Sequence, residues 1–142
     1  VGLRPLRNLQ IDANAALLEA RFDDFTEVVA GAPVSRNGNL PPNVPERLGN
    51  LWVTWQFQPQ WSAGAGAQYV GRRAANNANT VYAPSFTTLD MFLSWAVARG
   101  AVLTLRGRNL TDEVYALTAS NAGGQFIVGP PRSIALEARF AF

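Results

Sequence analysis

The side chains that could take part in chemistry in this chain are mostly those of arginine, aspartate, asparagine and tyrosine. The sequence contains no histidine and no cysteine. This composition excludes disulfide bonds, metal sites built on these residues, and Ser-His or Cys-His nucleophilic pairs. Asp23 and Asp24 are adjacent carboxylates, but no partner at a suitable spacing follows them. The sequence therefore predicts that the protein is not an enzyme and holds no cofactor or metal.

A polar segment after residue 70 is a candidate for binding a small ligand. It combines two arginines with several amides and a phenol, namely Arg72, Arg73, Asn76, Asn77, Asn79 and Tyr82. Guanidinium groups form charge-assisted and often bidentate hydrogen bonds with anions. The segment could bind an anionic ligand in this way. The alternative is a solvated polar loop.

A second set of charged residues falls on one face of three expected strands. It consists of Asp90, Arg106, Arg108, Glu137 and Arg139. A three-residue turn at 98–100 would place Asp90 opposite Arg108, and such a cross-strand pair contributes from a few tenths to about 1 kcal/mol. The set could be a charge ladder that contacts another part of the protein, or simply the wetted wall of a lumen.

Strict alternation of apolar and polar residues positions these side chains on about six β-strands. We expect the strands at 8–22, 50–57, 61–71, 86–97, 101–110 and 132–142. A slip in the phase of the first strand after Ala15 suggests a bulge. Short and long connections alternate along the chain. The sequence therefore predicts an all-β, antiparallel up-and-down meander with one plain rim and one elaborate rim.

The apolar face of these strands carries aromatic residues at both rims and aliphatic residues between them. Trp55, Phe57, Trp61, Trp95, Phe140 and Phe142 lie toward the plain rim, and Phe22, Tyr69, Phe86 and Tyr115 lie toward the elaborate rim. Aromatic side chains favour both interfaces of a bilayer, so this order favours a transmembrane barrel. A soluble β-sandwich would show the same alternation but would bury Trp55, Trp95 and Leu103. No transmembrane helix and no nucleic-acid-binding run of basic residues is expected.

Three segments resemble the C-terminal end of TonB-dependent outer-membrane receptors. RNLTDEVY (108–115) is similar to the Asn-Leu-(Thr/Phe)-Asp-x-x-Tyr motif of that family, and GPPRSIALEARFAF (129–142) to its closing strand. NVPERLGNLWVTWQF (43–57) is similar to the Pro-x-(Arg/His)-x-x-x-Asn-Leu segment of the family. The stretch 68–95 looks like the ferric-siderophore members of the group. Asn109, Thr111 and Asp112 within the first motif suit Asx-type turns at the end of a strand.

The resemblance implies the C-terminal part of a barrel in the outer membrane of a Gram-negative bacterium. Residues 1–142 would form a single barrel segment, without the plug domain that the family carries at its N-terminal end. The family imports a scarce nutrient, here a ferric siderophore, and is powered by a TonB-type transducer in the inner membrane. The resemblance also implies that Phe140 and Phe142 belong to an assembly signal, and that the ligand segment and the charge ladder contact the cargo and the plug.

Two other functions stay open from the sequence alone. One is a passive outer-membrane channel, and the other is a soluble β-sandwich binding module.

A segment of about six strands would also leave its first and last strands unpaired. Because unpaired strand edges recruit other strands, we expect the isolated segment to oligomerise or to require detergent.

Overall fold

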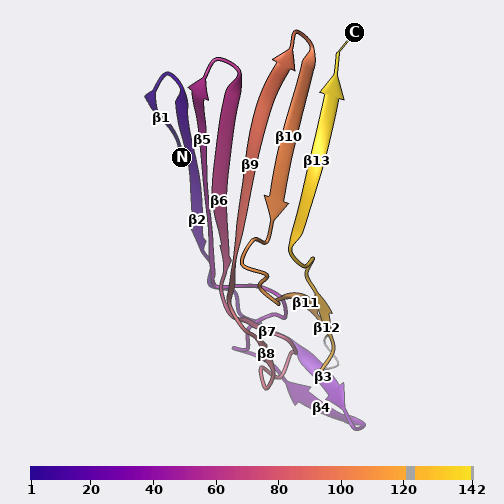
Figure 1. Ribbon diagram of the computed structural model, residues 1–142. Coiled ribbons are helices and arrows are strands. Elements are labelled where there is room, and N and C mark those ends of the chain that lie inside the picture. Colours follow the sequence, from indigo (N-terminus) through magenta and orange to yellow (C-terminus); the bar gives the residue numbers. More distant parts are fainter. Residues whose placement is uncertain (121–123, 142) are drawn as a thin grey trace.

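The computed structural model describes residues 1–120 and 124–141, and its main element is a single seven-stranded antiparallel sheet. The strand order is β1-β2-β5-β6-β9-β10-β13 (Figure 1). These strands are β1 (Gly2–Leu6), β2 (Leu9–Leu17), β5 (Arg47–Gln58), β6 (Trp61–Val70), β9 (Phe86–Ala98), β10 (Ala101–Arg108) and β13 (Ser133–Phe140). Successive sheet strands pair with each other, so the predicted up-and-down meander is confirmed.

The N-terminal part of the sheet differs from the sequence prediction in two ways. A seventh strand, β1, occupies a segment that the prediction left unassigned. The strand expected over 8–22 ends at Leu17, and β2 pairs with β5 in unbroken register from Leu9↔Trp55 to Leu17↔Arg47. No bulge therefore interrupts this pairing. The slip in the apolar phase marks the point where the chain leaves the sheet.

Three short turns lie together at one end of the sheet, drawn at the top of Figure 1. They join β1 to β2, β5 to β6, and β9 to β10. Gly100 in the third turn has a φ of 80°, and the register of β9 and β10 shifts between Ala101 and Val102. A glycine adopts this left-handed conformation without the steric cost that other residues pay, which confirms the hairpin predicted there.

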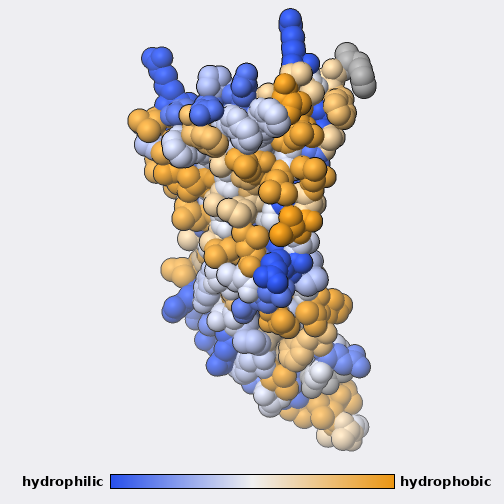
Figure 2. Space-filling view, in the orientation of Figure 1, coloured by the Kyte–Doolittle hydropathy of each residue, from blue (hydrophilic) through white to orange (hydrophobic). Residues whose placement is uncertain are grey.

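One face of the sheet is apolar, and its side chains are open rather than packed against a second sheet. Trp55 is 50% exposed and Trp95 is 41% exposed, while Leu136 reaches 72%. Hydrophobic side chains cover much of the sheet in the space-filling view (Figure 2). The alternative of a soluble sandwich, which would bury Trp55, Trp95 and Leu103, therefore does not hold, since none of the three is buried.

Large rings on this face gather toward the short turns. We call Trp55, Phe57, Trp61, Trp95 and Phe140 the aromatic band. The rings of Trp61 and Trp95 stack with centroids 5.3 Å apart at 3°, and Phe57 lies 6.4 Å from Trp61. Trp55 and Phe57 are 5.5 Å apart. Phe142, which was predicted to continue this row, lies outside the described residues.

The compact packing of the molecule lies in the long connections and not on the sheet. Among the described residues, the buried apolar side chains are Ala74, Ala75, Ala83, Phe86 and Ala119. Three small hairpins accompany them: β3 (Thr26–Val29) with β4 (Ala32–Ser35), β7 (Arg73–Ala74) with β8 (Tyr82–Ala83), and β11 (Ala116–Ala119) with β12 (Phe126–Val128). They lie beyond the end of the sheet opposite the short turns (Figure 1). Within the described residues, no helix has the length and apolarity required to cross a bilayer.

Opposite faces of the sheet should respond differently to a new charge. Leu93 is on the apolar face and pairs with Ala63 and Leu105, whereas Ser62 is on the polar face of the neighbouring strand. We expect Leu93→Arg to destabilise the folded protein in lipid by about 2–4 kcal/mol, because an arginine would enter hydrocarbon. Denaturant unfolding from vesicles measures this change.

The matched control is Ser62→Arg, which adds the same charge to the watery side of the sheet. It should change the unfolding free energy much less than Leu93→Arg does. Equal effects of the two substitutions would show that the faces are not oriented as described.

Candidate functional site

The three long connections form one cross-braced unit, which we call the loop layer (residues 18–46 and 71–85 and the described part of 109–132). Asparagine side chains connect its segments by pairing with backbone. Asn43 Nδ2 donates to Ala119 O at 2.9 Å, and Ala119 N donates to Asn43 Oδ1 at 2.7 Å. Asn79 pairs with both backbone groups of Leu40 in the same way, at 2.7 and 2.8 Å. An amide side chain carries a donor and an acceptor, so it can replace a strand as the partner of exposed backbone.

Arg73 is the most deeply placed charge of the loop layer, with 3% of its surface exposed. Its Nη2 donates to Ala116 O and to Leu117 O, the latter at 3.2 Å, and so holds β11 against β7. Its Nη1 is buried without a hydrogen-bond partner. Burial lowers the pKa of the Arg73 guanidinium from its ordinary value, although an arginine stays protonated at any physiological pH.

Phe86 belongs to this buried cluster and not to the aromatic rows that face outward, so its predicted place is wrong. It pairs with Val70 on the polar face of the sheet, where its ring stacks on Tyr115 at 4.2 Å. The Arg73 guanidinium carbon lies 5.8 Å from the centre of the Phe86 ring. The side-chain alternation continues into this end of β9, but the folded loops cover the polar face there.

The amides of the predicted ligand segment are engaged within the protein. Asn77 is 9% exposed, and its Nδ2 donates to Glu27 Oε1 at 3.0 Å. Asn76 Oδ1 accepts a hydrogen bond from Thr80 N at 3.0 Å and stabilises the turn between β7 and β8. Glu27 also pairs with Arg36 Nε at 2.9 Å. These polar groups therefore stabilise the loop layer.

Two residues of the predicted ligand segment remain accessible on the loop layer. The guanidinium carbon of Arg72 lies 3.8 Å from the centre of the Tyr82 ring, which is a cation–π contact. Arg72 is exposed and Tyr82 is partly exposed. Among the described residues Arg72 forms no ion pair. A charged, flat group next to a phenol is suited to an anionic ligand that also offers an aromatic or apolar surface.

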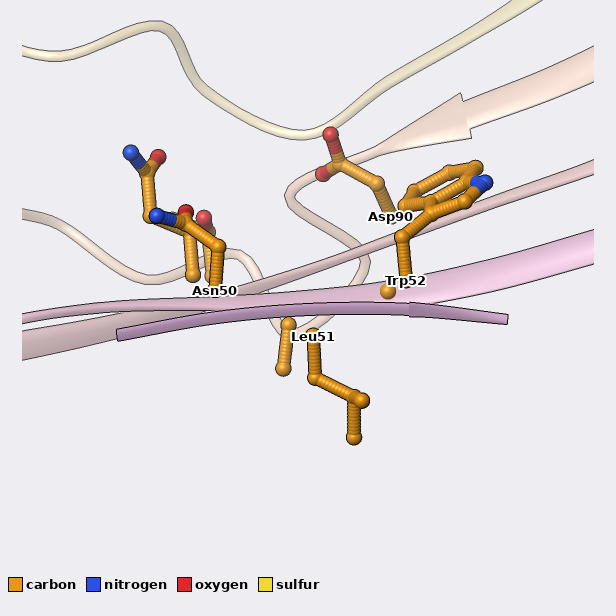
Figure 3. Close-up of a pocket in the computed structure, with 8 residues that line it drawn as sticks. Asn50, Leu51, Trp52 and Asp90 are labelled. Carbon is orange, nitrogen blue, oxygen red and sulfur yellow. The ribbon is translucent and has the colours of Figure 1, made fainter. Parts of the chain in front are cut away.

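A second candidate surface lies on the polar face of the sheet. A cavity of about 220 Å³ there is lined by Asn50, Leu51, Trp52, Gly66, Ala67, Gln68, Thr88 and Asp90. Asn50, Trp52 and Asp90 project to one side of the sheet, and Leu51 projects to the other side (Figure 3). Asn50 Nδ2 also donates to Asn14 Oδ1 at 2.8 Å. The cavity offers amide, hydroxyl and carboxylate groups next to an indole ring.

The polar face also carries two aromatic rings that lie flat on β6. A β-carbon at Gly66 would overlap the ring of Trp52, and one at Gly64 would overlap the ring of Phe92. The two rings stack with centroids 6.0 Å apart at 16°. Only glycine leaves the space for this close approach. The side-chain alternation along β5 and β9 places both rings on this face, but it does not indicate that they form a shelf over β6.

The predicted charge ladder continues from this shelf across β10 and β13. The guanidinium carbon of Arg106 lies 6.0 Å from the Phe92 ring, and its Nε lies 3.2 Å from Glu137 Oε1. Arg139 pairs with Val102 on the same face. The β9–β10 register, which runs to Gly107↔Met91, brings Arg108 opposite Asp90 as the turn length indicated.

Asp90 and Arg108 nevertheless form no ion pair among the described residues. The carboxylate instead accepts a hydrogen bond from Asn109 N at 2.9 Å. Asn109 has a φ of 47° and is 4% exposed, and its Oδ1 accepts from Glu113 N at 2.9 Å. Asp90 therefore helps to terminate β10, together with the Asx-type turn predicted at this motif.

No cluster of three or more histidine, cysteine, aspartate or glutamate residues in the described part of the chain could hold a metal ion. The loop layer also uses two residues that the sequence reasoning did not single out, Asn43 and Glu27. For Asn43 the available signal was the abundance of asparagine in the long connections, and Glu27 had no comparable signal. The sequence around Asn43 gives no indication that its side chain will pair with the backbone of Ala119.

The model of the TonB dependent receptor-like β-barrel family matches residues 4–110. The chain belongs to this family. It is 34% identical over 106 residues to a probable TonB-dependent siderophore receptor, PiuA of Acinetobacter baumannii, covering 75% of the chain and 14% of that protein. It is 27% identical over 148 residues to the ferrichrome outer membrane transporter/phage receptor of Escherichia coli K12, covering 96% of the chain and 20% of that protein.

The crystal structure of the A. baumannii siderophore receptor PiuA superimposes on this sheet and loop layer with a TM-score of 0.89. The match has 28% sequence identity and covers 98% of the chain but 20% of the PiuA chain. The present chain therefore corresponds to part of a TonB-dependent receptor barrel, and the family resides in the outer membrane of Gram-negative bacteria. In that setting the apolar face meets lipid and the polar face meets the lumen.

The role of Arg73 in the loop layer can be tested by replacing it. Arg73→Met removes the donors to Ala116 O and Leu117 O while keeping much of the side-chain volume. Hydrogen bonds to a charged group contribute about 1.5–3 kcal/mol, so amide exchange in β11 should become at least about tenfold faster. Hydrogen exchange read by mass spectrometry measures this rate.

Arg72→Met is the matched control, since it removes the neighbouring arginine that is exposed. It should leave exchange in β11 unchanged. If Arg73→Met also left that exchange unchanged, Arg73 would not be the residue that holds β11.

Proposed function

We propose that the intact protein containing residues 1–142 imports a ferric siderophore across the outer membrane. The family match over residues 4–110 carries this proposal, and the named siderophore receptors among the relatives support the choice of cargo. Membership of this family also favours active import over a passive channel. The chain spans only 14–20% of the curated relatives described above, so the activity is that of the longer protein.

Within this function, the chain contributes a wall and an outer binding surface, and no catalytic step. The open polar groups of Arg72 and Tyr82 lie on the loop layer, at the end of the sheet opposite the short turns. In barrels of this kind the longer loops face the outside of the cell. Arg72 is thus suited to bind the anionic part of a ferric-siderophore complex, with Tyr82 packing beside it.

The polar face would contact the plug domain, which the family carries in the lumen. Arg106, Glu137 and Arg139 offer charges of both signs, and Asn50 with Gln68 offers amides. Asp90 and Arg108 border the same face near the loop layer. A TonB-type transducer would act on the plug, which lies outside residues 1–142. The wall would then guide the cargo after the plug moves.

The ligand surface is tested by replacing exposed Arg72 and partly exposed Tyr82 together in the intact protein. Arg72→Gln with Tyr82→Leu removes the charge and the ring without touching a buried residue. Because a charge-assisted hydrogen bond contributes about 1.5–3 kcal/mol, the Kd for the ferric siderophore should rise at least about tenfold. A panel of radioiron-loaded siderophores, with uptake by iron-starved cells, supplies the measurement.

Arg4→Gln is the control, since Arg4 is an exposed arginine near the other end of the sheet. It should leave affinity and uptake as in the unmodified protein. Deletion of the gene should abolish uptake of the cargo. Normal uptake of the whole panel after deletion would contradict the proposed function, whereas normal affinity of the double variant would contradict only the placement of the ligand surface.

A further inference from the structure

The end of the sheet with the short turns carries positive charge and no carboxylate in its turns. Arg7 is at the tip of the β1–β2 turn, and Arg99 is at the tip of the β9–β10 turn. Three carboxylates lie within strands of the sheet, namely Asp12, Asp90 and Glu137. The other seven of the ten lie in the long connections, namely Glu19, Asp23, Asp24, Glu27, Glu46, Asp112 and Glu113.

These two arginines lie just beyond the last lipid-facing side chains at this end of the sheet. Phe140 of the aromatic band is 62% exposed and lies opposite Ala101, two residues from Arg99. Leu6, which directly precedes Arg7, is 58% exposed and pairs with Leu9. Strongly hydrophilic groups project beyond this end in the space-filling view (Figure 2). Because aromatic bands mark the bilayer interface, Arg7 and Arg99 lie at the depth of the lipid headgroups.

Neither arginine is neutralised within the part of the chain that the structure describes. Arg7 and Arg99 are both exposed, and neither takes part in the ion pairs found there. Arg4 and Arg7 border a space of about 260 Å³ on the polar face, next to Gln10, Thr54 and Gln56, so positive charge also gathers on the lumen side of this rim. A guanidinium at the tip of a turn is long enough to reach the headgroups that surround the rim.

We propose that this end of the protein is a binding surface for anionic phospholipids of the adjoining leaflet, with Arg7 and Arg99 holding their phosphodiester groups. The geometry suits a lipid because the same molecule can place acyl chains on the aromatic band and phosphate on the turns. Arginine binds a phosphate group through two parallel hydrogen bonds. A zwitterionic headgroup also has a phosphate, but its positive group reduces the net attraction to an arginine. The proposal depends on the membrane placement of the barrel and not on which cargo is imported.

Lipid selection by the intact protein tests this proposal. The protein is reconstituted in vesicles with equal amounts of phosphatidylcholine and phosphatidylglycerol, extracted gently, and analysed by native mass spectrometry for retained lipid. The unmodified protein should retain phosphatidylglycerol in excess. Arg7→Gln and Arg99→Gln should each weaken this preference about fivefold, in line with about 1 kcal/mol per basic residue near an anionic surface. The double variant should retain the two lipids equally.

Arg139→Gln is the matched control, because it removes an equal charge on the lumen side of β13, near the same end of the sheet. It should keep the preference. Raising the salt concentration should reduce the preference of the unmodified protein, which needs no variant at all. A preference that persists in the double variant, that is lost equally in Arg139→Gln, or that does not respond to salt would overturn the proposal. None of these outcomes bears on iron uptake.

Discussion

The pairing of every backbone N–H and C=O group in a lipid environment is the constraint on which this structure depends. Hydrocarbon provides no water to satisfy these groups, so the strands must satisfy each other. Within the sheet, β5 pairs on one side with β2 and on the other with β6 over nearly its whole length. Side chains then alternate between lipid and lumen, and this alternation makes Trp95 exposed and Trp52 inward-facing without any second layer.

The loop layer meets the same requirement by a different route. Its segments are too irregular to form a ladder of backbone hydrogen bonds. The side-chain amides of Asn43 and Asn79 instead donate to and accept from the backbone of distant residues. Both residues have positive φ angles, 63° and 55°, which asparagine tolerates better than most residues. Arg73 extends this network with a charge, although burying a charge without a carboxylate partner is costly. The three long connections therefore behave as one body that presents Arg72 and Tyr82.

Small residues in β6 shape the lumen side of the sheet. Gly64 and Gly66 let Phe92 and Trp52 lie flat against the sheet, which makes the lumen wall smooth at this height. Arg106 then reaches the edge of this shelf and pairs with Glu137 from the last strand. Such a wall offers apolar and charged groups side by side, which suits a surface that another domain must contact and release.

The sequence by itself determined the central parts of six of the seven sheet strands, their order, the alternation of their side chains between two faces and the turn at Gly100, because a period of two and glycine's left-handed freedom are local properties. It also determined the family, through the motif around Asn109. Only the tertiary structure decided that Asn77 and Arg73 are buried while Arg72 is open. It also decided that Asp90 binds the backbone of Asn109 instead of Arg108. These outcomes depend on which loop segments, tens of residues apart, come to lie against each other, and no local pattern encodes that proximity.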